Sequence, residues 1–140
     1  MKTYISDDRP QPESQIGAAL ESLAHTIHER REVGEKSYTY RLLTGDLDTL
    51  LKKLVEEAHE TTLAAKDVEA PGAKPEEVDH LRYEAGDVVY HLMVLLERCG
   101  ISLDEFAAEM NSRMTEDEIK LRGGVALLKP EYVNRGHHEE

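Results

Sequence analysis

Two pairs of carboxylates occupy equivalent positions in two stretches of the chain that have the pattern of amphipathic helices. Glu57 and Glu60 are three residues apart in the first stretch, and Glu84 and Asp87 are three apart in the second. Residues at this spacing project from the same face of a helix, so each pair would place two negative charges side by side. Such a pair is costly unless a cation neutralises it, and a hard divalent ion with oxygen ligands is the natural candidate.

A single acidic pair is weak evidence for a metal site, because 29 of the 140 residues are acidic and most such pairs are simply solvated. The second pair makes the pattern specific. A turn signal around Gly72 joins the two stretches, so their helices must pack antiparallel. Glu60 and Glu84 are equally distant from Gly72, which brings the two pairs to the same height. We therefore expect a site for Mg²⁺, or alternatively Mn²⁺, formed by Glu57, Glu60, Glu84 and Asp87.

Two long helices would position these carboxylates. The first is expected over residues 46–67, with Asp46 as its N-cap, and the second over residues 75–98, with Pro75 in its first turn. Each has an apolar stripe that we expect to face the core. The stripes comprise Leu47, Leu50, Leu51, Leu54, Val55, Ala58, Thr62 and Ala65 in the first helix, and Val78, Leu81, Ala85, Val88, Val89, Leu92, Met93, Leu95 and Leu96 in the second. Glycine is costly inside a helix, so Gly86 favours a close helix–helix approach, with a neutral surface site as the alternative.

The remaining segments are also expected to be helical. Apolar spacing predicts a helix over residues 15–31 and a short helical turn near Tyr40 that Gly45 ends. A capping box that begins at Ser102 predicts a helix to about residue 114, and a second one that begins at Thr115 predicts another short helix. No segment shows the period-two pattern of a strand.

The expected fold is therefore all-α, with an antiparallel helical hairpin and flanking helices. We expect one domain over residues 15–114, between a flexible N-terminal lead-in at 1–14 and a C-terminal extension at 115–140. A chain of this size buries a limited share of its surface, so a homodimer is also expected.

The composition argues against several classes of protein. The formal net charge is −12 and no segment forms a basic stripe, so we expect no nucleic-acid partner. No apolar run is long enough to cross a membrane, and the N-terminus lacks the apolar core of a signal peptide, so we expect a cytoplasmic protein. The single cysteine, Cys99, excludes an intramolecular disulfide, and its place near the end of an apolar run favours a buried side chain.

Cations near the acidic residues favour a substrate that contains phosphate groups. Lys53 lies on the same edge of the first helix as Glu57 and Glu60. A metal ion with Lys and Arg side chains can bind a polyphosphate and offset the charge on a departing pyrophosphate. The chain has no glycine-rich phosphate loop and no serine-nucleophile motif, so we expect neither of those mechanisms.

Six short motifs make the chain similar to the phosphoribosyl-ATP pyrophosphohydrolases, a branch of the MazG-like all-α nucleotide pyrophosphatases. They are SYT at residues 37–39, KK at 52–53, EExxE at 56–60, AAK at 64–66, ExxD at 84–87 and YH at 90–91. The resemblance covers roughly residues 18–114. EExxE and ExxD are typical of the whole superfamily, whereas SYT, AAK and YH are typical of this branch.

The resemblance implies Mg²⁺-dependent hydrolysis of phosphoribosyl-ATP to phosphoribosyl-AMP and pyrophosphate, the second step of histidine biosynthesis. The four paired carboxylates would hold the metal ion, and Glu56 would help to remove a proton from the attacking water. Lys53 and Lys66 would neutralise phosphate oxygens, so that Glu56, Glu57 and Lys53 would be the catalytic residues. Substrate contacts would also come from Ser37, Tyr38, Thr39 and His91. The active unit would be a homodimer whose four-helix core uses helices of both chains.

Three other interpretations fit parts of the pattern. The same metal site would serve a related pyrophosphatase that acts on canonical or damaged (d)NTPs. The acidic residues could instead give solubility to a non-catalytic helical dimerisation module. A di-iron carboxylate bundle is a weaker third option, because it would need Glu-x-x-His on two helices and we expect that pattern to be missing.

The chain departs from the family pattern in three respects. Gly86 stands where Ala is usual, and the segments before and after the domain exceed the compact family domain. No cyclohydrolase domain accompanies the pyrophosphohydrolase motifs, so we expect another protein to perform the next step.

Overall fold

The computed structural model describes residues 15–113, which form five α-helices and one 3-10 turn. In chain order these are α1 (Ile16–Glu29), η1 (Arg30–Glu32), α2 (Tyr38–Thr44), α3 (Leu47–Glu69), α4 (Pro75–Arg98) and α5 (Leu103–Ser112). This part of the chain contains no strand, and the predicted all-α class is confirmed. The expectations for residues 1–14 and 115–140, including the second capping box, lie outside the described residues.

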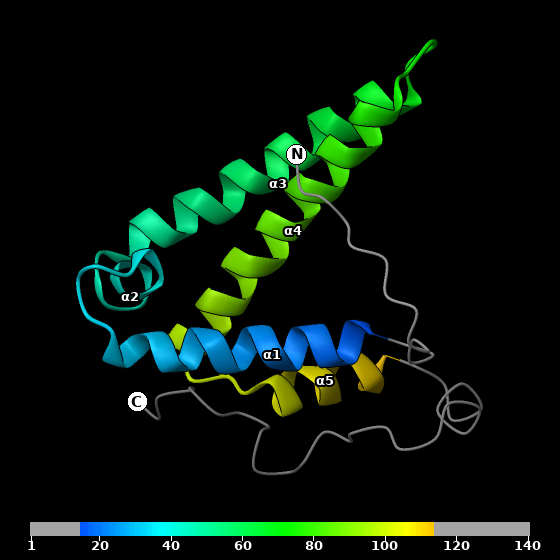
Figure 1. Cartoon of the computed structure of the whole chain (residues 1–140). Coiled ribbons are helices and arrows are strands. Elements are labelled where there is room, and N and C mark those ends of the chain that lie inside the picture. The colour runs from blue at the N-terminus through cyan, green and yellow to red at the C-terminus, as the bar shows by residue number, and fades with distance from the viewer. Residues whose placement is uncertain (1–14, 114–140) are drawn as a thin grey trace, which may run out of the picture.

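Helices α3 and α4 form the predicted hairpin and make the most extensive contact in the fold (Figure 1). The side chain of Asp46 caps α3 by accepting a hydrogen bond from the Asp48 amide at 3.1 Å. Gly72 turns the chain between the two helices with a φ of 80°, a value that favours glycine. Pro75 opens α4 as predicted, whereas α3 continues two residues beyond its predicted end, to Glu69.

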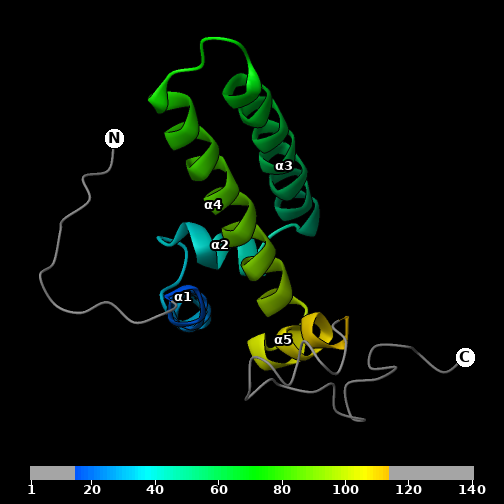
Figure 2. The ribbon, with the colours of Figure 1, turned by 90° about the vertical axis from the view of Figure 1, so that its right-hand side faces the viewer.

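The other helices gather at the open end of the hairpin. Helix α1 crosses beneath α4, α2 lies beside the start of α3, and α5 lies below α4 (Figures 1 and 2). The apolar core is at this junction and is formed by Ile27, Leu42, Leu43, Leu50, Met93 and Val94. The half of the hairpin nearer its turn lies outside this core. There α3 and α4 pack mainly against each other.

Two arginines fix the smaller helices to the end of α4. Arg31 Nε donates to the Glu97 carboxylate at 2.8 Å, and its NH2 group donates to the Glu97 carbonyl oxygen at 2.9 Å. Arg98 NH1 donates to the Leu42 carbonyl oxygen at 2.9 Å, which satisfies an acceptor in the last turn of α2. The end of α4 itself is closed by Gly100, whose φ is 72°.

For much of their length the predicted apolar stripes do not face the core of the single chain. The side chains of Leu51 and Val55 in α3 are 37% and 70% exposed, and Val89 in α4 is 39% exposed. Leu47 and Val78 are also exposed. We call these five residues the hairpin apolar face: Leu47, Leu51, Val55, Val78 and Val89.

The edge that carries the acids, rather than the stripe, forms the contact between α3 and α4. Glu57 and Glu84 are buried there, and the stripe residues Ala58 and Ala85 directly follow them. At about 100° per residue, both stripes are therefore rotated away from the contact in the same sense. Because the helices are antiparallel, that rotation brings both stripes to the same side of the hairpin, where they form one exposed surface.

Two smaller predictions, the close helix approach at Gly86 and the burial of Cys99, are wrong. Gly86 is exposed, and a Cβ atom added to it would meet nothing within 4 Å, so no close helix approach requires this glycine within the chain. Cys99 is exposed rather than buried, because it follows the last residue of α4 at the point where the chain leaves the core.

Candidate metal centre and substrate-binding residues

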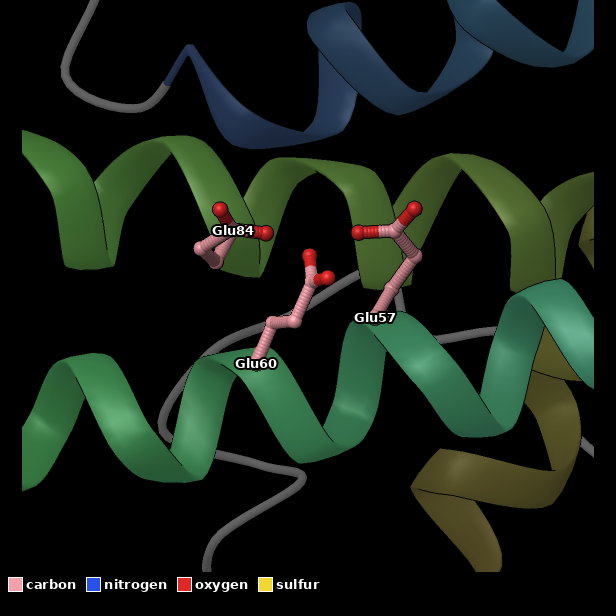
Figure 3. Close-up of side chains that lie close together, drawn as sticks. All are labelled: Glu57, Glu60 and Glu84. Carbon is pink, nitrogen blue, oxygen red and sulfur yellow. The ribbon is translucent and has the colours of Figure 1, made fainter.

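Three carboxylates from both helices of the hairpin come together near its middle. Glu57 and Glu60 of α3 and Glu84 of α4 each offer an oxygen, and these oxygens lie within 4.8 Å of one another (Figure 3). The counting argument from Gly72 predicted this meeting, and for these three residues it is confirmed. The separation suits a single cation that accepts one oxygen from each side chain.

The three carboxylates differ in exposure. Glu57 and Glu84 retain only 9% and 6% of their accessible surface, whereas Glu60 is exposed. Glu84 Oε1 lies 2.9 Å from Nε2 of His80, but its Oε2 is buried without a hydrogen-bond partner. A buried carboxylate oxygen without a partner is costly, and a cation beside Glu57 and Glu60 would satisfy it. The residues present therefore fit a bound divalent ion.

The electrostatics of Glu57 agree with this fit. The pKa of Glu57 is raised from 4.5 to about 7, first by burial and then by the nearby carboxylates of Asp87, Glu60 and Glu84, in that order of importance. Without a cation the cluster is thus expected to keep a proton near neutral pH. A divalent ion would displace that proton and favour the fully ionised carboxylates.

Asp87, the fourth predicted ligand, lies nearby but is not a member of the group of oxygens within 4.8 Å. It is close enough to contribute to the raised pKa of Glu57. The backbone oxygen of Asp87 accepts a hydrogen bond from His91 Nδ1 at 2.8 Å. The structure thus brings three of the four predicted ligands together and places the fourth at the edge of the cluster.

The SYT and YH motifs meet where α2 packs on α4. The Tyr38 hydroxyl lies 3.2 Å from His91 Nε2, and the Thr39 hydroxyl is hydrogen-bonded to the Tyr90 hydroxyl. A carbonyl oxygen can only accept a hydrogen bond, so His91 Nδ1 is protonated and donates to the Asp87 carbonyl oxygen. In the neutral ring Nε2 is then the acceptor, and the Tyr38 hydroxyl donates to it.

These contacts give the motif residues structural roles within the chain. His91 is only 4% exposed and links Tyr38 to the backbone of α4. Ser37 is the N-cap of α2, since its hydroxyl accepts a hydrogen bond from the Tyr40 amide at 3.2 Å. Tyr38 remains partly exposed and is the motif residue that presents the most surface to a ligand.

Lys53 links Tyr38 to the acidic cluster. Burial raises the pKa of Tyr38, the Lys53 charge opposes that shift, and the charges of Glu57 and Asp87 add to it. The Nζ of Lys53 lies 3.0 Å from Glu56 Oε2, and this hydrogen bond raises the pKa of Lys53. Glu56 therefore contacts Lys53, whereas Glu57, the next residue, points into the cluster.

Lys66 is the predicted residue that the single chain does not bring to the cluster. It lies nine residues after Glu57 in α3, which is a rotation of about half a turn around the helix. Its exposed side chain therefore projects from the side of α3 opposite Glu57. A role in phosphate binding would need a second copy of the chain or a bound substrate that extends around the helix.

Sequence reasoning missed His80 as a partner of Glu84. The signal was the spacing of four residues on one helix, which places His80 one turn before Glu84. The expectation that Glu-x-x-His is missing is wrong, because this spacing occurs at Glu56–His59 and Glu77–His80. Neither histidine belongs to the group of metal-ligating atoms among the described residues, which is made of three glutamates. The structure thus gives no support to a di-iron bundle.

A helical hairpin with carboxylates of both helices facing one another is the arrangement expected for an all-α nucleotide pyrophosphatase. Comparison with known proteins narrows this class. The family model described as phosphoribosyl-ATP pyrophosphohydrolase matches residues 20–114. The chain belongs to the phosphoribosyl-ATP pyrophosphohydrolase family, and it is therefore an enzyme that hydrolyses an acid anhydride.

Individual relatives agree with the family match. A phosphoribosyl-ATP pyrophosphatase of Rhodopirellula baltica is 41% identical over 103 residues, which are 73% of this chain and 80% of the relative. One of Lactiplantibacillus plantarum is 40% identical over 95 residues, or 67% of this chain and 82% of the relative. One of Pyrobaculum calidifontis is 42% identical over 96 residues, or 68% of this chain and 94% of the relative.

Within the described residues, none of the helices has the length and apolar character that a membrane span requires.

Proposed function

We propose that the protein hydrolyses phosphoribosyl-ATP to phosphoribosyl-AMP and pyrophosphate, the second step of histidine biosynthesis. In this reaction the anhydride bond between the α- and β-phosphates breaks, water supplies the oxygen of the new bond to phosphorus, and pyrophosphate leaves. Membership of the family and the names of the relatives support this substrate. A cytoplasmic location and the absence of a nucleic-acid partner stay predictions from the sequence.

Mg²⁺ is the proposed cofactor, with Mn²⁺ as a substitute. The observation that carries this proposal is the buried, unpartnered Oε2 of Glu84 beside the oxygens of Glu57 and Glu60. These three residues would hold the ion, with Asp87 available at the edge of the cluster. When bound, the ion would neutralise triphosphate charge and polarise the phosphorus–oxygen bonds for attack by water.

The residues of the chain have complementary tasks in this proposal. Lys53 offsets charge on a phosphate oxygen, and Tyr38, with Ser37 and Thr39 behind it, contacts the substrate from α2. Glu56 would accept the proton of the attacking water, as the family resemblance implies, from its place beside Lys53 at the edge of the cluster. His91 fixes the direction of the Tyr38 hydroxyl from its buried position.

The hairpin apolar face supports a homodimer. Two long helices that each expose part of an apolar stripe on the same side of a hairpin leave a surface that favours association. A second copy with the same surface would cover it and complete a four-helix core. This arrangement also explains why the stripes are apolar although the single chain leaves them exposed.

The function is tested by measuring pyrophosphate release in Mg²⁺ with phosphoribosyl-ATP, ATP, dCTP and dUTP offered separately. We expect rapid turnover of phosphoribosyl-ATP and a loss of about 100-fold or more in Glu84→Gln, which removes a metal ligand. Glu29→Gln, on α1 and remote from the cluster, is the matched control. Preference for a dNTP would overturn the substrate, and no release from any compound would overturn the proposed reaction.

A further inference from the structure

His80 is in direct contact with Glu84, one of the buried members of the carboxylate cluster. Its Nε2 lies 2.9 Å from Glu84 Oε1, across one turn of α4. The His80 side chain is 56% exposed, so one face is in water and the other meets the carboxylate. The second oxygen of Glu84 has no such partner.

The chemistry of this contact fixes the donor. As a metal ligand Glu84 is a carboxylate, which only accepts hydrogen bonds, so His80 Nε2 carries the proton and donates. The contact occupies Oε1 and leaves Oε2 for the cluster. In Figure 3 one oxygen of Glu84 points toward Glu57 and Glu60 while the other points away from them. Rotation of the carboxylate would break the hydrogen bond to His80.

We propose that His80 is a positioning residue for the metal centre, which orients Glu84 so that one oxygen faces the cation. The inference rests on the proposed metal site. Hydrogen bonds from outer residues fix the geometry of carboxylate and histidine ligands, and their loss typically weakens metal binding about 10- to 100-fold. His80 itself touches neither the cation nor the substrate.

The chain contains a natural control for this contact. His25 and Glu29 on α1 have the same residue types at the same spacing, with His25 Nε2 at 3.1 Å from Glu29 Oε1. Both of those side chains are largely exposed, whereas Glu84 is buried. The two pairs therefore share a local hydrogen bond and differ in whether the acceptor belongs to the carboxylate cluster.

The test is Mn²⁺ binding to metal-free protein, followed by the electron paramagnetic resonance signal of the free ion. Four proteins are compared: wild type, His80→Ala, His80→Gln and His25→Ala. We expect His80→Ala to raise the Kd for Mn²⁺ about 10-fold or more. His80→Gln, whose amide can still donate to Glu84, should recover most of that loss, and His25→Ala should bind as wild type does.

The outcomes separate this inference from the proposed function. Wild-type affinity in His80→Ala would overturn the positioning role and leave the metal site intact. An equal loss in His80→Gln would also overturn it, because the donated hydrogen bond would then not be the cause. If wild type binds no Mn²⁺, the metal site itself is overturned, and the role of His80 falls with it.

Discussion

Glu57 of α3 and Glu84 of α4 place carboxylate oxygens within 4.8 Å of each other across the hairpin, although both side chains are more than nine-tenths buried. Folding alone does not favour such a contact, because two like charges in a desolvated position repel. The chain adopts it in the absence of any neighbouring Lys or Arg that pairs with either residue in the described structure. The proposed cation would therefore meet carboxylates that are already arranged around its site.

The first prediction concerns the pH dependence of stability without metal. The folded-state pKa of Glu57, about 7, is above its ordinary value of 4.5, so the folded protein binds more protons than the unfolded chain between these values. The free energy of unfolding in EDTA should therefore fall as the pH rises through this window, by at most about 1.4 kcal/mol per pH unit. Urea denaturation at a series of pH values measures this slope.

Glu57→Gln should remove most of that slope and should be more stable than wild type at pH 8 without metal. Addition of Mg²⁺ should stabilise wild type at pH 8 and leave Glu57→Gln nearly unchanged. A wild-type protein whose stability in EDTA rises from pH 5 to pH 7 would contradict the assignment.

The second prediction concerns the contact between η1 and α4. Burial would raise the pKa of Glu97, but hydrogen bonds from Arg31 and His28 outweigh it and lower the pKa. The resulting stabilisation is present above the ordinary pKa of 4.5 and is lost as the pH falls below it. Glu97→Gln should cost about 1–2 kcal/mol at pH 7 and much less at low pH.

Glu109→Gln is the matched control for Glu97→Gln. Glu109 forms an exposed ion pair with Arg113 at 3.2 Å within α5, where little stabilisation is expected. Thermal unfolding at pH 7 compares the two variants, and equal changes in both would refute a special role for the Glu97 contact.

The third prediction concerns the hairpin apolar face. Val55→Asp places a charge at the most exposed member of this surface, which a dimer would have to desolvate, so we expect the variant to be monomeric at micromolar concentration. Sedimentation velocity measures the change. Val33→Asp, at an apolar residue that is also exposed but follows η1, should leave the assembly unchanged. A monomeric wild type would contradict the proposed dimer.

The fourth prediction concerns the hydroxyl group of Tyr38. Tyr38→Phe keeps the ring and removes the hydrogen bond to His91, which should cost about 1 kcal/mol of stability. We also expect a KM for phosphoribosyl-ATP several-fold higher than in wild type, because α2 would be held less firmly beside the substrate. Steady-state kinetics and thermal unfolding measure the two effects. Tyr83→Phe, at an exposed tyrosine of α4, is the control and should change neither.

Counting along the chain correctly predicted that Glu57, Glu60 and Glu84 meet. The hairpin has few degrees of freedom once its turn lies at Gly72, so equal separations from the turn placed Glu60 opposite Glu84. The N-cap at Asp46 and the start of α4 at Pro75 were correct for a similar reason, since they depend on local chemistry.

Orientation about the helix axis was harder to predict. Periodicity reveals an apolar stripe but does not say which neighbour covers it, so it did not show that the single chain leaves Leu51 and Val55 exposed. The same difficulty applies to Cys99, which follows an apolar run but is exposed at the end of α4. The contact between His80 and Glu84 depends on side-chain rotamers that no spacing rule specifies.

Because α2 is attached to α4, the distance between the carboxylate cluster and Tyr38 is set by a length of α4. Glu84 lies in the carboxylate cluster and His91 holds Tyr38, and both belong to one uninterrupted helix. Seven residues at the usual rise per residue separate them by about 10 Å along its axis. A single inserted residue between them would rotate one end by about 100° relative to the other. The distance between the proposed cation site and Tyr38, the proposed substrate contact, is thus set by the number of residues between Glu84 and His91. It does not depend on how α1 and α5 pack.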